Sequence, residues 1–515
     1  MIHAEISAAA NYTDLMNNVR LFASGIMSRG YSGVGNGILK SVDLGATPVR
    51  ETWTITATAI VTVFDVVGSV SGSVIGFETA TVGTAYDNGI IKFTIQAGGV
   101  TFVVGDAFTL TVWQITDAVV GVGKVAVTAG GTGATSGNLI FTGGGYSRIA
   151  AGTYIASAGV IVSTTITDRG AGYTSEPTVT ADSGAGATLT PSLMYPWDTL
   201  RHSAYDGTNM ELIMMGQGDG GLDEIYVGIK NFTGTSTEGN IYNWKLNGFS
   251  GFGAATAFEE QAGGMKTPTT YNLTAATSST WPSGSTYSYP TRDLPPFISL
   301  DSSATPIEYW LTWGGRYITL VAKVAGGASY EPIILGLGKQ LMTTGQFPMP
   351  LIVGGSHTGR QNLWRYSHAG SDHSAFPDAA GSSNISPLRY RHIDGAWRTL
   401  FNRDTADAIT LENNKVTWPW IGRGIANLRD NIDGSHTLFP VIAGYGDAMG
   451  VGDILFELPG IFAVPGRYFG AARAYPYTGA GTDQAAENKI GTKYVIFPNA
   501  YRTDYDRFFA LQVED

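Results

Sequence analysis

The sequence predicts a mainly β protein, built from several antiparallel β-sandwich or barrel-like domains and a short N-terminal helix. Composition is the first observation behind this prediction. Charged residues make up 14% of the 515 residues, below the ~25% usual in soluble proteins, whereas the chain holds 69 Gly and 21 Pro. Gly supplies the positive φ that turns need, and Thr fits a pleated surface. The second observation is that short alternating apolar runs recur between turn signals.

The clearest of these runs lie within residues 211–253. An apolar run at 212–215 is followed by a Gly/Asp turn, and apolar residues then alternate with Tyr, Gly and Lys over 225–230. A polar loop leads to a last run at 242–246. This order predicts strand, turn, strand, loop and strand.

The same pattern recurs at 308–317 and 452–464, so we expect one β-rich body over 192–515. Two stretches rich in small and polar residues, 254–300 and 354–391, predict long surface loops. Such loops usually serve binding or assembly. The aromatic residues of the body, Trp244 among them, are expected in its core rather than in a sugar-binding groove.

The N-terminal segment predicts the one helix. Asn11 and Asp14 give an N-cap signal, and apolar residues follow at helical spacing, namely Leu15, Met16, Val19 and Phe22. The apolar stripe is either a docking face for the β body or a contact with a partner subunit. Residues 30–45 are Gly-rich and predict an irregular arm, so 1–49 form a helix and an arm.

Residues 50–117 predict a small β domain, because strand-like runs recur at roughly ten-residue spacing. These runs are 51–59, 62–70, 90–95 and 101–113. Residues 118–191 differ, since charge almost vanishes and Gly and Thr dominate. The alternation at 161–167 predicts a small ordered β module rather than disorder.

Composition also excludes several functional classes. The net charge of −11 argues against a nucleic-acid binder, because neutralising phosphates requires clustered Lys and Arg. The absence of Cys excludes disulfides and thiolate metal sites. No apolar run approaches the ~20 residues of a membrane helix, and the first residues lack the pattern of a signal peptide. We therefore expect synthesis in the cytoplasm; a location outside the cell would require release by another route, such as lysis.

Few residues suggest chemistry. His368, Asp372 and His373, with Asp378 beyond, could ligate zinc or iron, but they match no established spacing and are expected to be polar loop residues. The cluster at 389–392, with Arg398, is expected to be a solvated face rather than a nucleic-acid site.

Three carboxylates in the first stretch form a second candidate group. Asp219, Asp223 and Glu224, with the glycines at 220–221, could hold a calcium ion, yet the EF-hand pattern is absent and a hairpin turn is favoured. No nucleophile elbow, phosphate-binding loop or zinc-protease motif occurs. We therefore assign no catalytic, cofactor-binding or metal-binding residue, and expect no enzyme.

Several motifs, in order along most of the chain, resemble virion structural proteins of tailed bacteriophages. They are 51–54 (ETWT), 66–72, 80–83, 102–108, 223–229, 243–249, 309–310 with 314–317, 346–350 with 354–356, and 497–503. The segment 118–191 departs from this pattern, and its run at 170–180 (GAGYTSEPTVT) resembles small β modules of phage fibre and adhesion proteins. This resemblance implies that 118–191 is an inserted Gly/Thr-rich β module exposed on the particle surface.

The resemblance implies a non-enzymatic scaffold in the virion tail, at the tail tip or baseplate. Its partners would be copies of itself in a symmetric assembly and other tail proteins, with no nucleic acid, no cofactor and no membrane insertion. Two alternatives stay open: a tail protein or spike that binds host cell-surface glycan, and a head or neck decoration protein.

Overall fold

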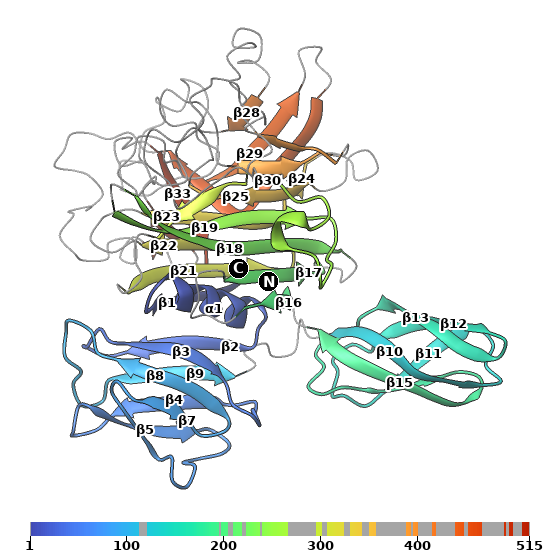
Figure 1. Cartoon of the computed structure of the whole chain (residues 1–515), viewed down its shortest axis with the longest axis horizontal. Helices are drawn as coiled ribbons and strands as arrows, with labels where there is room; N and C mark the ends of the chain where they lie inside the picture. The colour runs from blue at the N-terminus through green and yellow to red at the C-terminus, as the bar shows by residue number, and fades with distance from the viewer. Residues whose placement is uncertain are drawn as a thin grey trace.

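The computed structural model is mainly β, with several antiparallel sheets, and so confirms the predicted fold class. Figure 1 shows a large body above the helix α1, a blue β domain beneath it, and a teal module to one side. The structure describes residues 2–112, 121–194, 197–203, 210–218, 223–236, 239–265, 295–300, 306–323, 330–341, 350–356, 388–392, 395–399, 415–418, 438–446, 452–465, 489–490, 494–497 and 507–513.

The middle sheet of the body has seven antiparallel strands in the order β1-β21-β22-β23-β25-β26-β27. The N-terminal strand β1 pairs along its whole length with β21, so His3 lies opposite Trp313 and Ala9 opposite Ile307. The strands are β1 (His3–Ala9), β21 (Ile307–Gly314), β22 (Tyr317–Lys323), β23 (Tyr330–Leu337), β25 (Leu351–Gly354), β26 (Leu388–Arg391) and β27 (Trp397–Thr399).

Two further sheets flank the middle sheet. The first outer sheet has the order β16-β17-β18-β19-β20, with β16 (Trp197–His202), β17 (Glu211–Gly216), β18 (Ile225–Ser236), β19 (Gly239–Phe249) and β20 (Phe297–Ser299). The second outer sheet contains β24 (Lys339–Gln340), β28 (Lys415–Trp418), β29 (Phe439–Gly446), β30 (Gly452–Pro465), β31 (Lys489–Ile490), β32 (Tyr494–Phe497) and β33 (Arg507–Gln512).

Both faces of the middle sheet are buried. On β21, Leu311 and Trp313 belong to the core shared with the first outer sheet, whereas Trp310 belongs to a separate core shared with the second. Phe497 of β32 meets Trp310 in that second core, with ring centroids 5.0 Å apart. A strand covered on both faces reads as an almost continuous apolar run, which explains the sequence of β21.

The three strands predicted in 211–253 are confirmed as β17, β18 and β19. The polar loop predicted between the last two is wrong, because β18 and β19 stay paired as far as Ser236 opposite Gly239. The run at 308–317 forms the hairpin of β21 and β22, and the run at 452–464 forms the single long strand β30. The predicted loops 254–300 and 354–391, in contrast, are too long, because each contains a strand. Residues 297–299 form β20 and residues 388–391 form β26, because buried pairing partners on β19 and β25 support strands too short to show a period.

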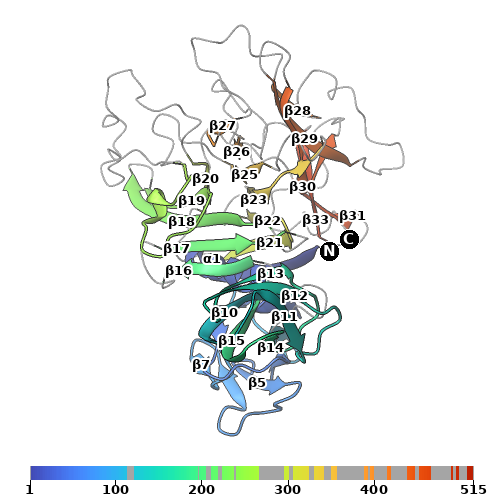
Figure 2. The same cartoon turned by 90° about the vertical axis from the view of Figure 1, so that its right-hand side faces the viewer.

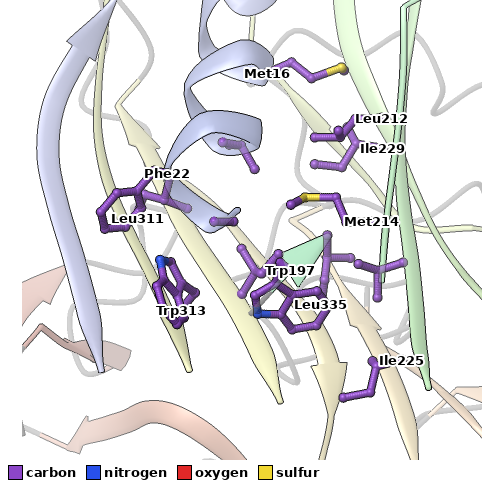
Figure 3. Close-up of a cluster of buried hydrophobic side chains, with 14 of the residues drawn as sticks. Met16, Phe22, Trp197, Leu212, Met214, Ile225, Ile229, Leu311, Trp313 and Leu335 are labelled. Carbon is purple, nitrogen blue, oxygen red and sulfur yellow. The ribbon is translucent and has the colours of Figure 1, made fainter. Parts of the chain in front are cut away.

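The helix α1 (Tyr12–Ala23) is confirmed, and it begins as predicted. The Asn11 side chain accepts hydrogen bonds from the backbone N–H groups of Thr13 and Asp14, each at 3.0 Å. Eleven of its twelve residues are buried. Figure 3 shows Met16 and Phe22 among side chains of both sheets, including Leu212, Met214 and Leu311. The stripe therefore docks on the helix's own chain.

The N-terminal β domain is larger than predicted. Strands β4 (Thr52–Ala57), β5 (Val63–Gly68), β8 (Ile91–Gln96) and β9 (Ala107–Val112) match predicted runs, and β6 (Thr79–Thr81) and β7 (Ala85–Asp87) are added. The irregular arm at 30–45 is wrong, because this region holds half of β2 (Met27–Ser32) and all of β3 (Ile38–Leu44). These strands pair with β9 and β8, in which the paired residues lie 47–85 residues away, so the local pattern does not reveal them.

The segment 121–194 forms a small barrel-like sheet in the order β10-β15-β14-β11-β12-β13. Its edges approach each other, since the Thr164 hydroxyl of β13 donates to the carbonyl of Val125 on β10. Figure 2 shows this module, in teal, in end view. The strands are β10 (Gly121–Thr132), β11 (Gly137–Thr142), β12 (Ala151–Ser157), β13 (Val160–Asp168), β14 (Thr178–Ala181) and β15 (Ala185–Met194).

The run GAGYTSEP packs into this barrel through its tyrosine. Tyr173 is buried, and its hydroxyl accepts a hydrogen bond of 2.8 Å from the backbone N–H of Ala150. Gly170 has φ +69° and lies against the backbone of Arg148 and Ala150, where a Cβ would collide. Gly170 and Tyr173 of the motif are therefore packing residues.

Candidate interaction surfaces

Of the predicted carboxylate group, Asp223 is held by an ion pair. Arg316 Nε donates to Asp223 Oδ2 at 3.0 Å, and the backbone N–H of Asp223 donates to the carbonyl of Gln217. Burial raises the pKa of Tyr226, and the neighbouring Glu224 carboxylate adds to that rise. Asp219 lies outside the described residues. Because the Asp223 carboxylate is already paired with the Arg316 guanidinium, a role in the turn is favoured over a role as a cation ligand.

The histidine candidates His368 and His373, with Asp372 and Asp378, also lie outside the described residues. Within the described ranges, no three His, Asp or Glu side chains are grouped closely enough to hold a metal ion.

The expected solvated face at 389–392 is wrong for Arg389. Its side chain is fully buried, at 0% exposure, because β26 is an interior strand of the middle sheet. By strand alternation, Arg389 faces the first outer sheet, as does Glu331 on β23, which is also fully buried. Glu331 accepts hydrogen bonds from the backbone N–H of Ser299 and the hydroxyl of Ser356. Arg389 and Glu331 are therefore buried charged residues of the core between the two sheets, and neither belongs to a solvated face.

A network of five charges on the first outer sheet was not predicted. Glu211 pairs with Lys230 at 2.8 Å and with Arg201 at 3.3 Å, while Glu259 pairs with Lys245 at 2.6 Å and with Lys230 at 3.1 Å. Each strand from β16 to β19 contributes one residue, and the short 3₁₀ helix η1 (Phe258–Glu260) contributes Glu259. Cross-strand register brings these residues together, so their spacing in sequence carries no signal.

The network fastens the segment 250–261 to the sheet. Arg201 Nη2 donates to the carbonyls of Gly253, Ala254 and Thr256 at 2.7–2.9 Å. Although burial opposes it, the two ammonium groups lower the pKa of Glu259. Because every one of these charges has an opposite partner, the cluster is a structural latch.

A second polar cluster joins β1 to the N-terminal β domain. Glu5 is 3% exposed; its Oε1 accepts from the Tyr309 hydroxyl at 2.5 Å, and its Oε2 accepts from the backbone N–H of Arg29 at 2.7 Å. Burial raises the pKa of Glu5 to about 7, against the opposing effects of the Arg29 charge and both hydrogen bonds. A side chain so closed to solvent is a junction rather than a substrate site.

Aromatic residues mainly fill cores, as predicted. Five tryptophans, Trp53, Trp197, Trp244, Trp310 and Trp313, are among the largest fully buried side chains. The exposed aromatics of the described residues are scattered, since Tyr31, Phe77 and Tyr146 each pack against a different neighbour, respectively Phe108, Tyr86 and Tyr173. These three do not form a stacked platform for sugar rings.

One end of the N-terminal β domain carries exposed aliphatic side chains, which we call the aliphatic tip. It consists of three loops, 33–37, 58–62 and 97–106. The exposed side chains are Val34, Ile60, Val100, Val103 and Val104, each 42–70% exposed.

Hydrogen bonds bind the three loops of the tip together. The Asp106 carboxylate accepts from the backbone N–H groups of Val34, Gly35 and Val103 at 2.9–3.0 Å. Although burial opposes it, these three donors lower the pKa of Asp106. The backbone N–H of Ala57 donates to the Asp106 carbonyl and fixes the loop that carries Ile60.

Within the described ranges, no helix combines the length and apolar character required to span a bilayer. No model of a known protein family matches the chain, and no curated protein matches it.

Proposed function

We propose that the chain is a non-enzymatic structural component of a tailed-bacteriophage virion, at the tail tip or baseplate, where it assembles with other tail proteins. The observation that carries the proposal is the role of the residues in the quoted motifs. Trp53, Trp244 and Trp310 come from three of these motifs and are core residues with at most 1% exposure. Motifs made of core and turn residues favour a scaffold.

The arrangement of the chain supports the same proposal. The strand β1 pairs with β21, a strand about 300 residues further along the chain, and the buried helix α1 follows β1. The segment 3–23 therefore closes the body, and the barrel lies in the chain between β9 of the N-terminal β domain and β16 of the body. A closed body with an added module suits a subunit that docks in an assembly and presents one part outward.

Immunogold electron microscopy tests this proposal. Particles released from producing cells are labelled with antibody against the chain, and pre-immune serum serves as the control. We expect gold at the tail end of the particle. Gold on the capsid would support a decoration protein instead, and particles that never label would refute a role in the virion.

The barrel favours one alternative, a tail protein that binds host cell-surface glycan. Its outer face exposes Ile140, Ile155 and Val162, with exposed fractions of 46–57%. Contiguous exposed apolar patches mark interaction sites, and Ile155 and Val162 lie on the paired strands β12 and β13. Binding of the purified chain to host-cell polysaccharide would support this role, and degradation of that polysaccharide would identify a spike enzyme.

A further inference from the structure

We infer that the aliphatic tip of the N-terminal β domain is the surface through which two copies of this chain meet. The inference rests on the proposed assembly role and names the contact by which that assembly starts.

The tip is a preformed surface. Val34 and Val103 donate their backbone N–H groups to the two oxygens of the same Asp106 carboxylate. Asn36 and Val100 hold the neighbouring loops together, since the backbone N–H of Asn36 donates to the Val100 carbonyl and the Asn36 side chain accepts from the Val100 N–H at 2.7 Å. Loops fixed in this way lose little conformational entropy when they dock.

The tip is also almost free of charge. Residues 33–37, 58–62 and 97–105 contain no Lys, Arg, Asp, Glu or His. The adjoining Asp106 is 1% exposed, and its oxygens face the loops that it holds. The chain as a whole carries a net charge of −11.

This charge pattern decides between occupants. An anionic lipid surface or a nucleic acid requires basic residues, which the tip lacks. A charged protein surface would find no complementary charge. An uncharged apolar protein surface can pack against the tip, and the tip of a second copy is such a surface. Two copies that each carry a net charge of −11 repel each other, and an uncharged face adds least to this repulsion when they approach. The same tip on both copies would then form the contact, which makes it isologous.

The opposite end of the same domain provides a comparison. Its loop 69–78 exposes Val70 and Ile75, at 73% and 91%. That end also carries the exposed Glu78, whereas Glu51 beside it is 5% exposed and accepts from the backbone N–H groups of Val70 and Ser71. Two copies meeting there would place carboxylates near each other, which disfavours the contact.

Sedimentation velocity on the full chain tests the inference, from about 1 μM to about 100 μM. The variants are Val34→Asp and Val104→Asp in the tip, with Ile75→Asp as the control at the opposite end. We expect the wild type and the control to associate with increasing concentration. Each tip variant should raise the dissociation constant at least about tenfold, because a contact between two copies buries the new carboxylate twice. Unchanged circular dichroism and melting temperature establish that the variants fold.

Three results would overturn the inference: a wild-type chain that stays monomeric throughout, tip variants that associate like the wild type, or an equal loss in Ile75→Asp. Failure here is separable from failure of the proposed function. Gold-labelled tails with a monomeric purified chain refute only the tip contact. Unlabelled particles with association that depends on the tip refute only the virion role.

Discussion

Replacing Glu5 by Gln should remove a pH dependence of stability that originates at the junction between β1 and β2. Glu5 is buried, and the groups that face it are the Tyr309 hydroxyl from β21 and Arg29 from β2. Its pKa is raised from 4.5 to about 7 by burial. The folded chain therefore holds this proton more tightly than the unfolded chain does.

The magnitude follows from that difference. At about 1.4 kcal/mol for each pKa unit, a rise from 4.5 to about 7 corresponds to roughly 3 kcal/mol. Because the folded-state pKa is the higher one, this stability is fully present below pH 4.5 and is lost as the pH rises through about 7. Most of the loss should fall between pH 5 and pH 8, and amount to about 2–3 kcal/mol.

The assay is guanidinium unfolding followed by tryptophan fluorescence at both pH values. Trp313, which stacks on His3 of β1 at a centroid distance of 4.0 Å, reports on the same junction. The free-energy difference between wild type and Glu5→Gln should change by about 2–3 kcal/mol between the two pH values. Glu308→Gln, an exposed change on β21, should keep the wild-type pH dependence. A difference between wild type and Glu5→Gln that is the same at pH 5 and pH 8 would refute the reasoning from burial.

Three further substitutions test a buried ring, a helix cap and a buried hydrogen bond. Trp244→Ala removes a fully buried ring of β19 and should cost about 3–5 kcal/mol in chemical unfolding, whereas an unmoved midpoint would remove this ring from the core. Asn11→Ala should cost about 1 kcal/mol because α1 loses its cap; Asn11→Ser should restore most of it, and equal losses in both variants would contradict the cap. Tyr173→Phe should cost about 1–3 kcal/mol, since the buried Ala150 N–H loses its acceptor. Faster hydrogen exchange at Ala150 checks this, with the exposed Tyr146→Phe as the control.

Local patterns predicted the elements whose signals are local. Asn11 and the apolar spacing from Leu15 to Phe22 are sufficient for a helix, because a cap and a 3.6-residue period both act within one turn or two. The alternation around Ile225 and Val227 likewise identifies β18. The fold class required no more than these signals and the turn residues.

Elements stabilised by distant partners could not be predicted in this way. The strand β3 is interrupted in its pairing between Lys40 and Asp43 and is preceded by glycines, so its alternation is too short to read. Arg389 resembled a surface charge because nothing near it in sequence indicates that β26 lies inside a three-layer body. The charge latch of Lys230 and Glu259 depends on cross-strand register in the same way.

The barrel has a property that concerns the history of the chain. Its first and last strands lie side by side, with Gly121 opposite Met194, so the module leaves and rejoins the polypeptide at neighbouring points. A module whose two ends are adjacent can be gained, lost or exchanged by recombination without displacing the strands of the protein that receives it. Related genes should therefore carry different modules in place of 121–194, while the strands on either side keep their sequence. Chimaeric proteins can be made by exchanging the module at the same two points.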